Sequence, residues 1–175
     1  SLIAIGSIVY SLQLTNYYKS ETLIVIRSDS QNQGVLSAYS GVASMIGVSL
    51  PSTGSEKAME AIELIKSRKF VNHLISFPDV LPSIMAAKSY DFVTKKIIYD
   101  KNIFNPDTNE WNREMGQNGS TMPSYLEAHK RYRGSLVSID QDKETGFVAI
   151  KVEHISPVFA KEFLELIIRE ANALL

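Results

Sequence analysis

The chain has 175 residues, enough for one domain with a sizeable core, and its formal net charge is -1. This balance gives no overall attraction to nucleic acid or to anionic membranes, so nucleic acid is not an expected partner. The absence of cysteine excludes a disulfide framework, thiol catalysis and thiolate metal sites, but leaves the cellular compartment open.

The N-terminal stretch Ser1–Leu14 (SLIAIGSIVYSLQL) contains no charged residue. A spanning helix needs about 20 apolar residues, so this stretch alone is too short to cross a bilayer. It is either a buried strand or core helix, or the outer end of a spanning helix whose tyrosines, up to Tyr18, lie in the interfacial belt. A signal peptide is disfavoured, because there is no basic leader or small-residue cleavage site. In the spanning interpretation the lipid-embedded residues are Leu2, Ile3, Ile5, Ile8, Val9 and Leu12.

Two segments follow before the first clear helix. Tyr18–Ser28 is rich in β-branched residues and predicts a strand, and we expect it in the centre of a sheet because neither face is cleanly polar. Gly34–Val48 is rich in small residues and predicts a helix of low stability or a closely packed loop. Its glycines are not a nucleotide site, because neither a P-loop nor a G-x-G-x-x-G motif occurs.

Helical spacing then covers two consecutive segments. Thr53, with Glu56 three residues later, matches a capping box for the next helix, which we expect over Glu56–Lys69. Ser67–Ile75 resumes the helical pattern and includes His73, which we expect to be partly buried. The apolar face of the first helix comprises Ala58, Ala61, Ile62 and Ile65, and the basic cluster at the junction comprises Lys66, Arg68 and Lys69.

The middle of the chain is less regular. Pro78 and Pro82 bracket a turn, after which Ile84–Val93 predicts one short helix. Lys101–Thr121 contains several turn signals and predicts a surface excursion, with Trp111 anchoring it to the body. Pro123–Arg133 predicts a helix closed by Gly134, with Leu126 and Tyr132 facing inward and His129 facing solvent.

The clearest signal lies in the last forty residues. Two apolar runs, Leu136–Asp140 and Phe147–Ile155, flank a polar turn and predict a β-hairpin. The early strand is a natural partner for it. In the second run, alternation predicts one buried face comprising Val148, Ile150 and Val152, opposite Lys151 and Glu153.

A final amphipathic helix follows the hairpin. Ser156 is a good N-cap, and Pro157 suits the first helical position. The sequence reaches Leu175 without a stop signal, so we expect this helix to be cut short. Its predicted apolar stripe comprises Ala160, Leu164, Ile167, Ala171 and Leu174, and its predicted charged side comprises Lys161, Glu165 and Arg169.

No catalytic motif emerges. The histidines His73, His129 and His154 are dispersed, and no G-x-S-x-G elbow occurs. We therefore assign no catalytic, metal-binding or cofactor-binding residue. Paired carboxylates could cleave a glycan, but sequence alone brings no two together. The available acids are Glu110, Glu127, Asp140 and Glu153.

The chain resembles the periplasmic part of bacterial polysaccharide chain-length determinants, the co-polymerases that set the length of O-antigen or related glycans. The resemblance spans essentially the whole sequence, although Phe163 stands where such proteins often carry Trp. The order and spacing of short pieces carry it. These are Val9-Tyr10, Tyr18-Lys19-Ser20, Ser40–Ser44 with Gly47, Ala61–Phe70, Glu110–Arg113, Pro123-Ser124, Asp140 with Thr145-Gly146, and Ser156-Pro157 with Ala160.

The resemblance implies a bacterial inner-membrane protein of the α+β class, with its main domain in the periplasm and no catalysis. The implied division is residues 1–14 as the end of a transmembrane helix, 15–155 as an α/β base domain with a small mixed sheet and packed helices, and 156–175 as the start of a long helix. The implied partners are other copies of the chain in a ring-like oligomer, a membrane glycan polymerase, the nascent polysaccharide and the lipid bilayer.

Two rival functions stay open. One is a module of an exopolysaccharide export co-polymerase joined to a tyrosine autokinase, and the other is a periplasmic glycan-cleaving enzyme. If the chain is a chain-length determinant, we expect subunit or glycan contacts on the charged sides of two helices, the one that follows Thr53 and the final one. The candidate contact residues are Glu56, Glu63, Lys66, Arg68, Lys69, Lys161, Glu165 and Arg169.

Overall fold

A computed structural model describes residues 16–24, 53–142 and 147–175 of the chain. The predictions for Ser1–Leu14 and Gly34–Val48 lie outside these residues. Within them, no helix is long and apolar enough to cross a membrane. The elements in chain order are β1 (Tyr18–Ile24), α3 (Thr53–Lys66), α4 (Arg68–Leu74), α5 (Val80–Ala86), β2 (Ala87–Asp91), β3 (Lys96–Tyr99), β4 (Phe104–Asn105), β5 (Glu110–Trp111), α6 (Tyr125–Arg131), the π-helix η1 (Tyr132–Leu136), β6 (Val137–Gln141), β7 (Val148–His154) and α7 (Pro157–Leu174).

The main sheet has the strand order β1-β7-β6, and both pairings are antiparallel. The predicted hairpin and its pairing with the early strand are confirmed. Two other expectations are wrong. The sheet is not mixed, because every strand pair in the described ranges is antiparallel, and β1 lies at an edge of the sheet. The exposed charged residues Lys19 and Glu21 of β1 are of the kind that protects an edge strand from pairing with another chain.

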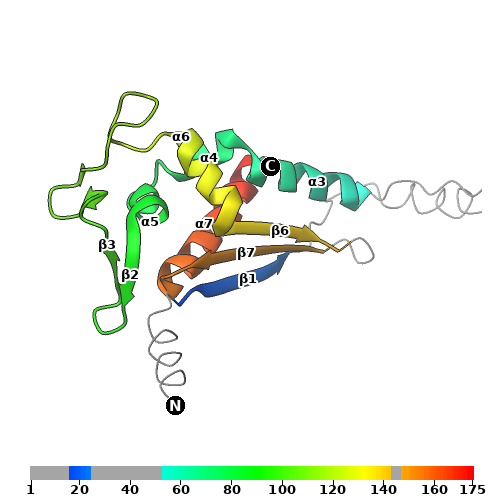
Figure 1. Ribbon diagram of the computed structural model, residues 1–175. Coiled ribbons are helices and arrows are strands. Elements are labelled where there is room, and N and C mark those ends of the chain that lie inside the picture. The colour runs from blue at the N-terminus through cyan, green and yellow to red at the C-terminus, as the bar shows by residue number, and fades with distance from the viewer. Residues whose placement is uncertain (1–15, 25–52, 143–146) are drawn as a thin grey trace, which may run out of the picture.

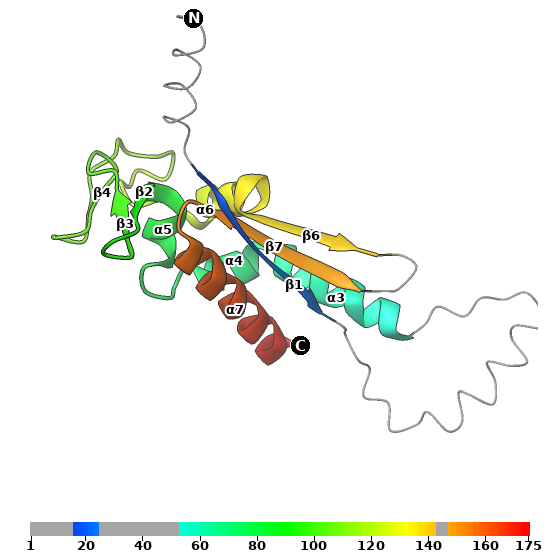
Figure 2. The ribbon, with the colours of Figure 1, turned by 90° about the horizontal axis from the view of Figure 1, so that it is seen from below.

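The helices α3, α4, α6 and α7 lie on one side of this sheet (Figures 1 and 2). The predicted alternation in β7 is confirmed, because Val148, Ile150 and Val152 are buried against them. The other side of the sheet is mostly polar and exposed. There Lys151 Nζ lies 3.4 Å from both Glu21 Oε1 and Asp140 Oδ2, so one lysine joins all three strands. The fold is therefore a two-layer α+β domain with an open sheet face.

The predicted final helix is confirmed as α7. Ser156 Oγ accepts a hydrogen bond from the Phe159 backbone N–H at 3.1 Å, and Pro157 is the first helical residue. The predicted stripe is buried except for Leu174, the last residue of α7, which is 55% exposed. Phe163 and Leu166 are buried as well. Hence α7 contributes to the same core as the sheet.

The two earlier helices are also confirmed. α3 buries its predicted apolar face. The capping pair expected at its start involves side chains that the structure does not describe. Ser67 separates α3 from α4 and caps α4, because its Oγ accepts from the Phe70 N–H at 3.1 Å. α4 then buries Phe70, Val71 and Leu74. The basic junction therefore lies at a sharp break between two packed helices.

The segment after Pro82 differs from the prediction. Instead of one helix over Ile84–Val93, α5 ends at Ala86 and β2 begins, pairing antiparallel with β3. Pro82 is the third residue of α5, where no intrahelical N–H bond is lost. The Asp91 carboxylate accepts from the Val93 N–H at 2.8 Å and from Thr94 Oγ1 at 2.7 Å. This local bonding closes a turn where the apolar spacing suggested a helix.

The predicted helix over Pro123–Arg133 is present but is not closed by Gly134. α6 runs directly into the π-helix η1, which includes Gly134 and ends at the first residue before β6. Tyr132 is buried as expected, with its ring 6.2 Å from that of Phe163, whereas Leu126 is 47% exposed. The Tyr132 hydroxyl has no hydrogen-bond partner among the described residues.

The predicted surface excursion is confirmed and is held at two points. Trp111 packs against the core with its ring 4.9 Å from that of Phe104, as the anchor prediction requires. Arg113 donates to both carboxylate oxygens of Glu127 at 2.6 and 3.0 Å and to the Thr121 carbonyl at 2.7 Å. Glu127 also forms a capping box with Ser124 at the start of α6. The excursion is thus tied to α6.

Replacing Glu127 tests this tie. Arg113 and the Ser124 N–H lower the pKa of Glu127 from 4.5 to about 2, so the stabilisation is complete above pH 4.5 and is lost as the pH falls towards 2. Because the pair is partly exposed, Glu127→Gln should lower the free energy of unfolding by about 1–2 kcal/mol at pH 7. Urea unfolding at pH 7 and pH 3 checks this. The difference in the free energy of unfolding between the wild type and Glu127→Gln should be smaller at pH 3 than at pH 7. Replacing the exposed Glu114 by Gln should leave the free energy of unfolding unchanged at both pH values.

Tyr132→Phe should leave the free energy of unfolding unchanged or raise it by up to about 1 kcal/mol, because the buried hydroxyl has no hydrogen-bond partner in the described part of the chain. Tyr132→Leu should lower it by about 2 kcal/mol or more, through the lost ring contact and packing. Thermal unfolding followed by circular dichroism separates the two. A large loss in Tyr132→Phe would show that the hydroxyl has a partner.

Candidate functional site

One end of the domain brings together the start of β1, the start of α7 and the turn between β2 and β3, along the lower left of Figure 1. Register pairing places Tyr18 opposite His154, two residues before the cap of α7. The rings of Tyr18 and Phe92 lie 5.8 Å apart, which brings the β2–β3 turn to the same place. We call this end, defined by Tyr17, Tyr18, Tyr90 and the turn Phe92–Lys95, the aromatic end.

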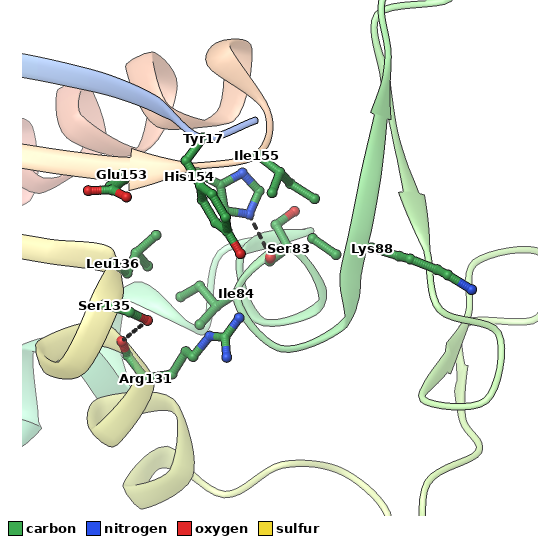
Figure 3. A pocket seen from close by; sticks show the side chains of 11 residues that line it. Tyr17, Ser83, Ile84, Lys88, Arg131, Ser135, Leu136, Glu153, His154 and Ile155 are labelled. Carbon is green, nitrogen blue, oxygen red and sulfur yellow. Dashed lines mark hydrogen bonds between the residues drawn. The ribbon is translucent and has the colours of Figure 1, made fainter. Parts of the chain in front are cut away.

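A hollow of about 290 Å³ opens beside the aromatic end, between α5, β7 and the junction of α6 with η1 (Figure 3). His154 and Ile155 form its floor with Ile84. Arg131 is directed at the hollow from the α6 side, whereas the Lys88 side chain points away from it. The remaining polar groups of the rim are those of Tyr17, Ser135 and Glu153.

The imidazole of His154 is buried and has a defined tautomer. Its Nδ1 accepts from the Ser156 backbone N–H at 3.0 Å, so Nε2 carries the proton and donates to the Ser83 carbonyl at 3.0 Å. Burial lowers the pKa of His154 below its ordinary value, and the charge of nearby Arg131 acts in the same direction. A second proton on Nδ1 would face an N–H donor, so this geometry also favours the neutral ring.

These bonds form part of a longer polar chain. Tyr99 OH and Ser83 Oγ lie 3.2 Å apart, which joins β3 to α5. His154 joins α5 to the end of β7, and Ser156 continues to the first turn of α7. The chain therefore runs under the hollow from the β2–β3 hairpin to the N-terminus of α7. Sequence reasoning gave His154 no role, since one of its two partners, Ser83, lies 71 residues away in the sequence.

The rim can hold a small polar group. A guanidinium, two hydroxyls and a carboxylate supply both donors and acceptors, which is the combination that binds sugar hydroxyls or a phosphate oxygen. A hollow of about 290 Å³ is at the small end of ligand-binding cavities. It therefore fits one ring of an extended polymer better than a large cofactor.

The acids considered for glycan cleavage do not converge. Glu153 lines the hollow, Glu127 pairs with Arg113, and Asp140 pairs with Lys151 on the open sheet face. Glu110 is exposed in β5. Over residues 16–24, 53–142 and 147–175, no group of three or more histidines and carboxylates could hold a metal ion.

The other two histidines have structural partners. His73 is partly buried, as expected, and its Nε2 lies 2.8 Å from Glu170 Oε2, which links α4 to α7. His129 was expected to face solvent, but it is partly buried and its Nε2 lies 3.0 Å from the Lys66 carbonyl. That carbonyl belongs to the last turn of α3 and has no later helical N–H to accept from.

The candidate contact residues lie in two separate groups. Glu63, Arg68 and Lys69 are exposed around the α3–α4 junction, where Lys66 is half-buried, and the Glu56 side chain lies outside the described ones. On α7, Lys161 and Glu165 are exposed and 3.8 Å apart. Arg169 instead pairs with Glu170 at 2.9 Å and lies over the Phe77 ring. Whether any of them contacts another subunit stays a prediction.

No model of a known protein family matches this chain, and no curated protein sequence matches it. The assignment of function therefore depends on the residues and on the geometry described above.

His154→Ala should lower the free energy of unfolding by about 2–4 kcal/mol, because the buried Ser83 carbonyl and Ser156 N–H both lose the imidazole that they bond to. Because folding lowers the pKa of His154, the wild-type stability is complete above about pH 6.5 and falls below it, as the unfolded chain takes up a proton that the folded one refuses. Chemical unfolding between pH 5 and pH 8 checks both points. If the free energy of unfolding of the variant depended on pH as strongly as that of the wild type, this assignment would be wrong.

Proposed function

We propose that the chain is a non-catalytic regulator of polysaccharide chain length, anchored in the bacterial inner membrane with this domain in the periplasm. One observation carries the proposal: the chain leaves its uncharged N-terminal stretch and begins α7 at the same end of the domain. If that stretch continues a spanning helix, the aromatic end faces the bilayer. α7 then starts beside the membrane and runs away from it across the sheet (Figure 2).

Three of the pieces that carry the family resemblance lie at the start of an element or at a break between elements in the described residues. Tyr18-Lys19-Ser20 begins β1, where the chain enters the domain. Ala61–Phe70 spans the break between α3 and α4, and Ser156-Pro157 forms the capped start of α7. Each of these three pieces therefore marks a point where an element begins or breaks.

The regulator acts by association in this proposal. Copies assemble into a ring beside a membrane glycan polymerase, using the exposed charges of α7 and of the α3–α4 junction. The hollow beside the aromatic end opens near the bilayer, where a membrane-linked glycan would grow. Its rim of Arg131, Tyr17 and Glu153 supplies contacts for a segment of the nascent polysaccharide.

Deleting the gene tests the proposal. The distribution of surface glycan lengths on a gel should lose its preferred length, and the intact gene should restore it. An unchanged distribution in the deletion strain would rule the function out.

The charged side of α7 supplies a finer test. Lys161→Glu combined with Glu165→Lys keeps an oppositely charged pair at the same two positions of α7, where the wild-type side chains lie 3.8 Å apart. The double variant exchanges the positive and the negative position that a neighbouring subunit would meet. This double variant should fold normally, shift the glycan length distribution and reduce the oligomer size in detergent. The matched control is Lys101→Glu with Asp107→Lys, an equally exposed pair at 3.4 Å in the excursion, which should leave both readouts unchanged.

A further inference from the structure

The β2–β3 turn presents the most exposed large apolar side chains near the aromatic end. Val93 is 92% exposed and Phe92 is 59% exposed, next to each other at the tip of a two-stranded hairpin. Single exposed apolar residues are ordinary on a protein surface. Two at one projecting tip are a different case, because the turn could have carried polar residues at no cost to the pairing of β2 and β3.

The tip is held rigidly. The Asp91 carboxylate accepts from the backbone N–H of Val93 and from Thr94, and Lys95 closes the turn with a left-handed backbone (φ 55°). Phe92 also contacts two tyrosines edge to face, with ring centroids 4.9 Å from Tyr90 and 5.8 Å from Tyr18. The fold therefore fixes the direction in which Phe92 and Val93 project. Binding would then cost the turn little further conformational entropy.

The surroundings of the tip have the composition of a bilayer interface. Tyr17, Tyr18 and Tyr90 are exposed or half-buried beside it, and aromatic side chains of this kind favour the level of lipid headgroups. Lys95 and Lys96 follow directly and are exposed, where they can reach headgroup phosphates. The apolar tip, the aromatic shoulder and the basic residues thus occur in the order expected of a segment entering lipid.

The location favours lipid over a second protein as the partner. Tyr18, in contact with Phe92, follows only four residues after the uncharged stretch Ser1–Leu14. A two-residue tip is also far smaller than the roughly 800 Å² that each partner buries in a stable protein interface. We propose that the β2–β3 turn inserts Phe92 and Val93 into the interfacial layer of the bilayer, with Lys95 and Lys96 at the phosphates.

This inference rests on the proposed membrane anchoring and adds a second contact to it. An apolar tip held beside a spanning helix would fix the tilt of the domain and the direction of α7 relative to the membrane. Two separated contacts restrict rotation that a single anchor leaves free. The hollow would then keep a constant height above the bilayer.

Spin labelling tests the insertion, because the chain has no cysteine and one introduced thiol is labelled uniquely. The full chain carrying Val93→Cys with a nitroxide is reconstituted into vesicles of phosphatidylethanolamine and phosphatidylglycerol. The collision rate of the label with oxygen should rise several-fold relative to that with a water-soluble nickel complex. The matched control is Met115→Cys, which is 74% exposed in the excursion and should keep the ratio of a label in water.

The outcomes are distinct. A lipid-embedded label at 93 beside a water-exposed label at 115 supports the inference, and Lys95→Gln with Lys96→Gln should then make the label shallower. A chain that does not associate with vesicles at all overturns the anchoring and this inference together. A chain that associates but keeps the label at 93 in water overturns the insertion alone. A label that is immobilised in detergent in a concentration-dependent manner identifies a second copy as the partner, and also overturns it.

Discussion

The neutral imidazole of His154 joins parts of the domain that no strand pairing connects. Its two nitrogens satisfy the Ser83 carbonyl of α5 and the Ser156 N–H at the start of α7, at 3.0 Å each. Through Ser83, the same chain reaches Tyr99 in β3. Among the described strands, the small β2–β3 sheet shares no ladder with the main sheet, so this buried polar connection and the Tyr18–Phe92 ring contact place the two sheets against each other. The hollow and the aromatic end both depend on that placement.

Local sequence patterns predicted those elements of the fold whose boundaries and buried faces depend on neighbouring residues. Alternation in β7 identified its buried face, and Ser156 with Pro157 identified the start of α7, because both signals depend on neighbouring residues alone. The hairpin itself followed from two apolar runs that flank a polar turn. Such elements carry their information within about a dozen residues.

Elements whose form depends on distant partners were missed. β2 was expected to be helical, since nothing near Ala87–Asp91 indicates that Lys96–Tyr99 will pair with it. β1 was expected to be central, because its apolar composition does not record which strand lies on its other side. His154 was left without a role for the same reason. The hollow is assembled from four segments of the chain, so only the tertiary structure could show it.

The π-helix η1 has a consequence for how this sequence tolerates change. A π-helical turn holds one residue more than an α-helical turn needs, and here it lies directly before β6. Removing that residue would rotate the helix by about 100° or slip β6 by one position, and either change turns inward side chains outward. An insertion or deletion within Tyr132–Leu136 would therefore change which side chains of β6 face the core, a change that no single substitution there makes.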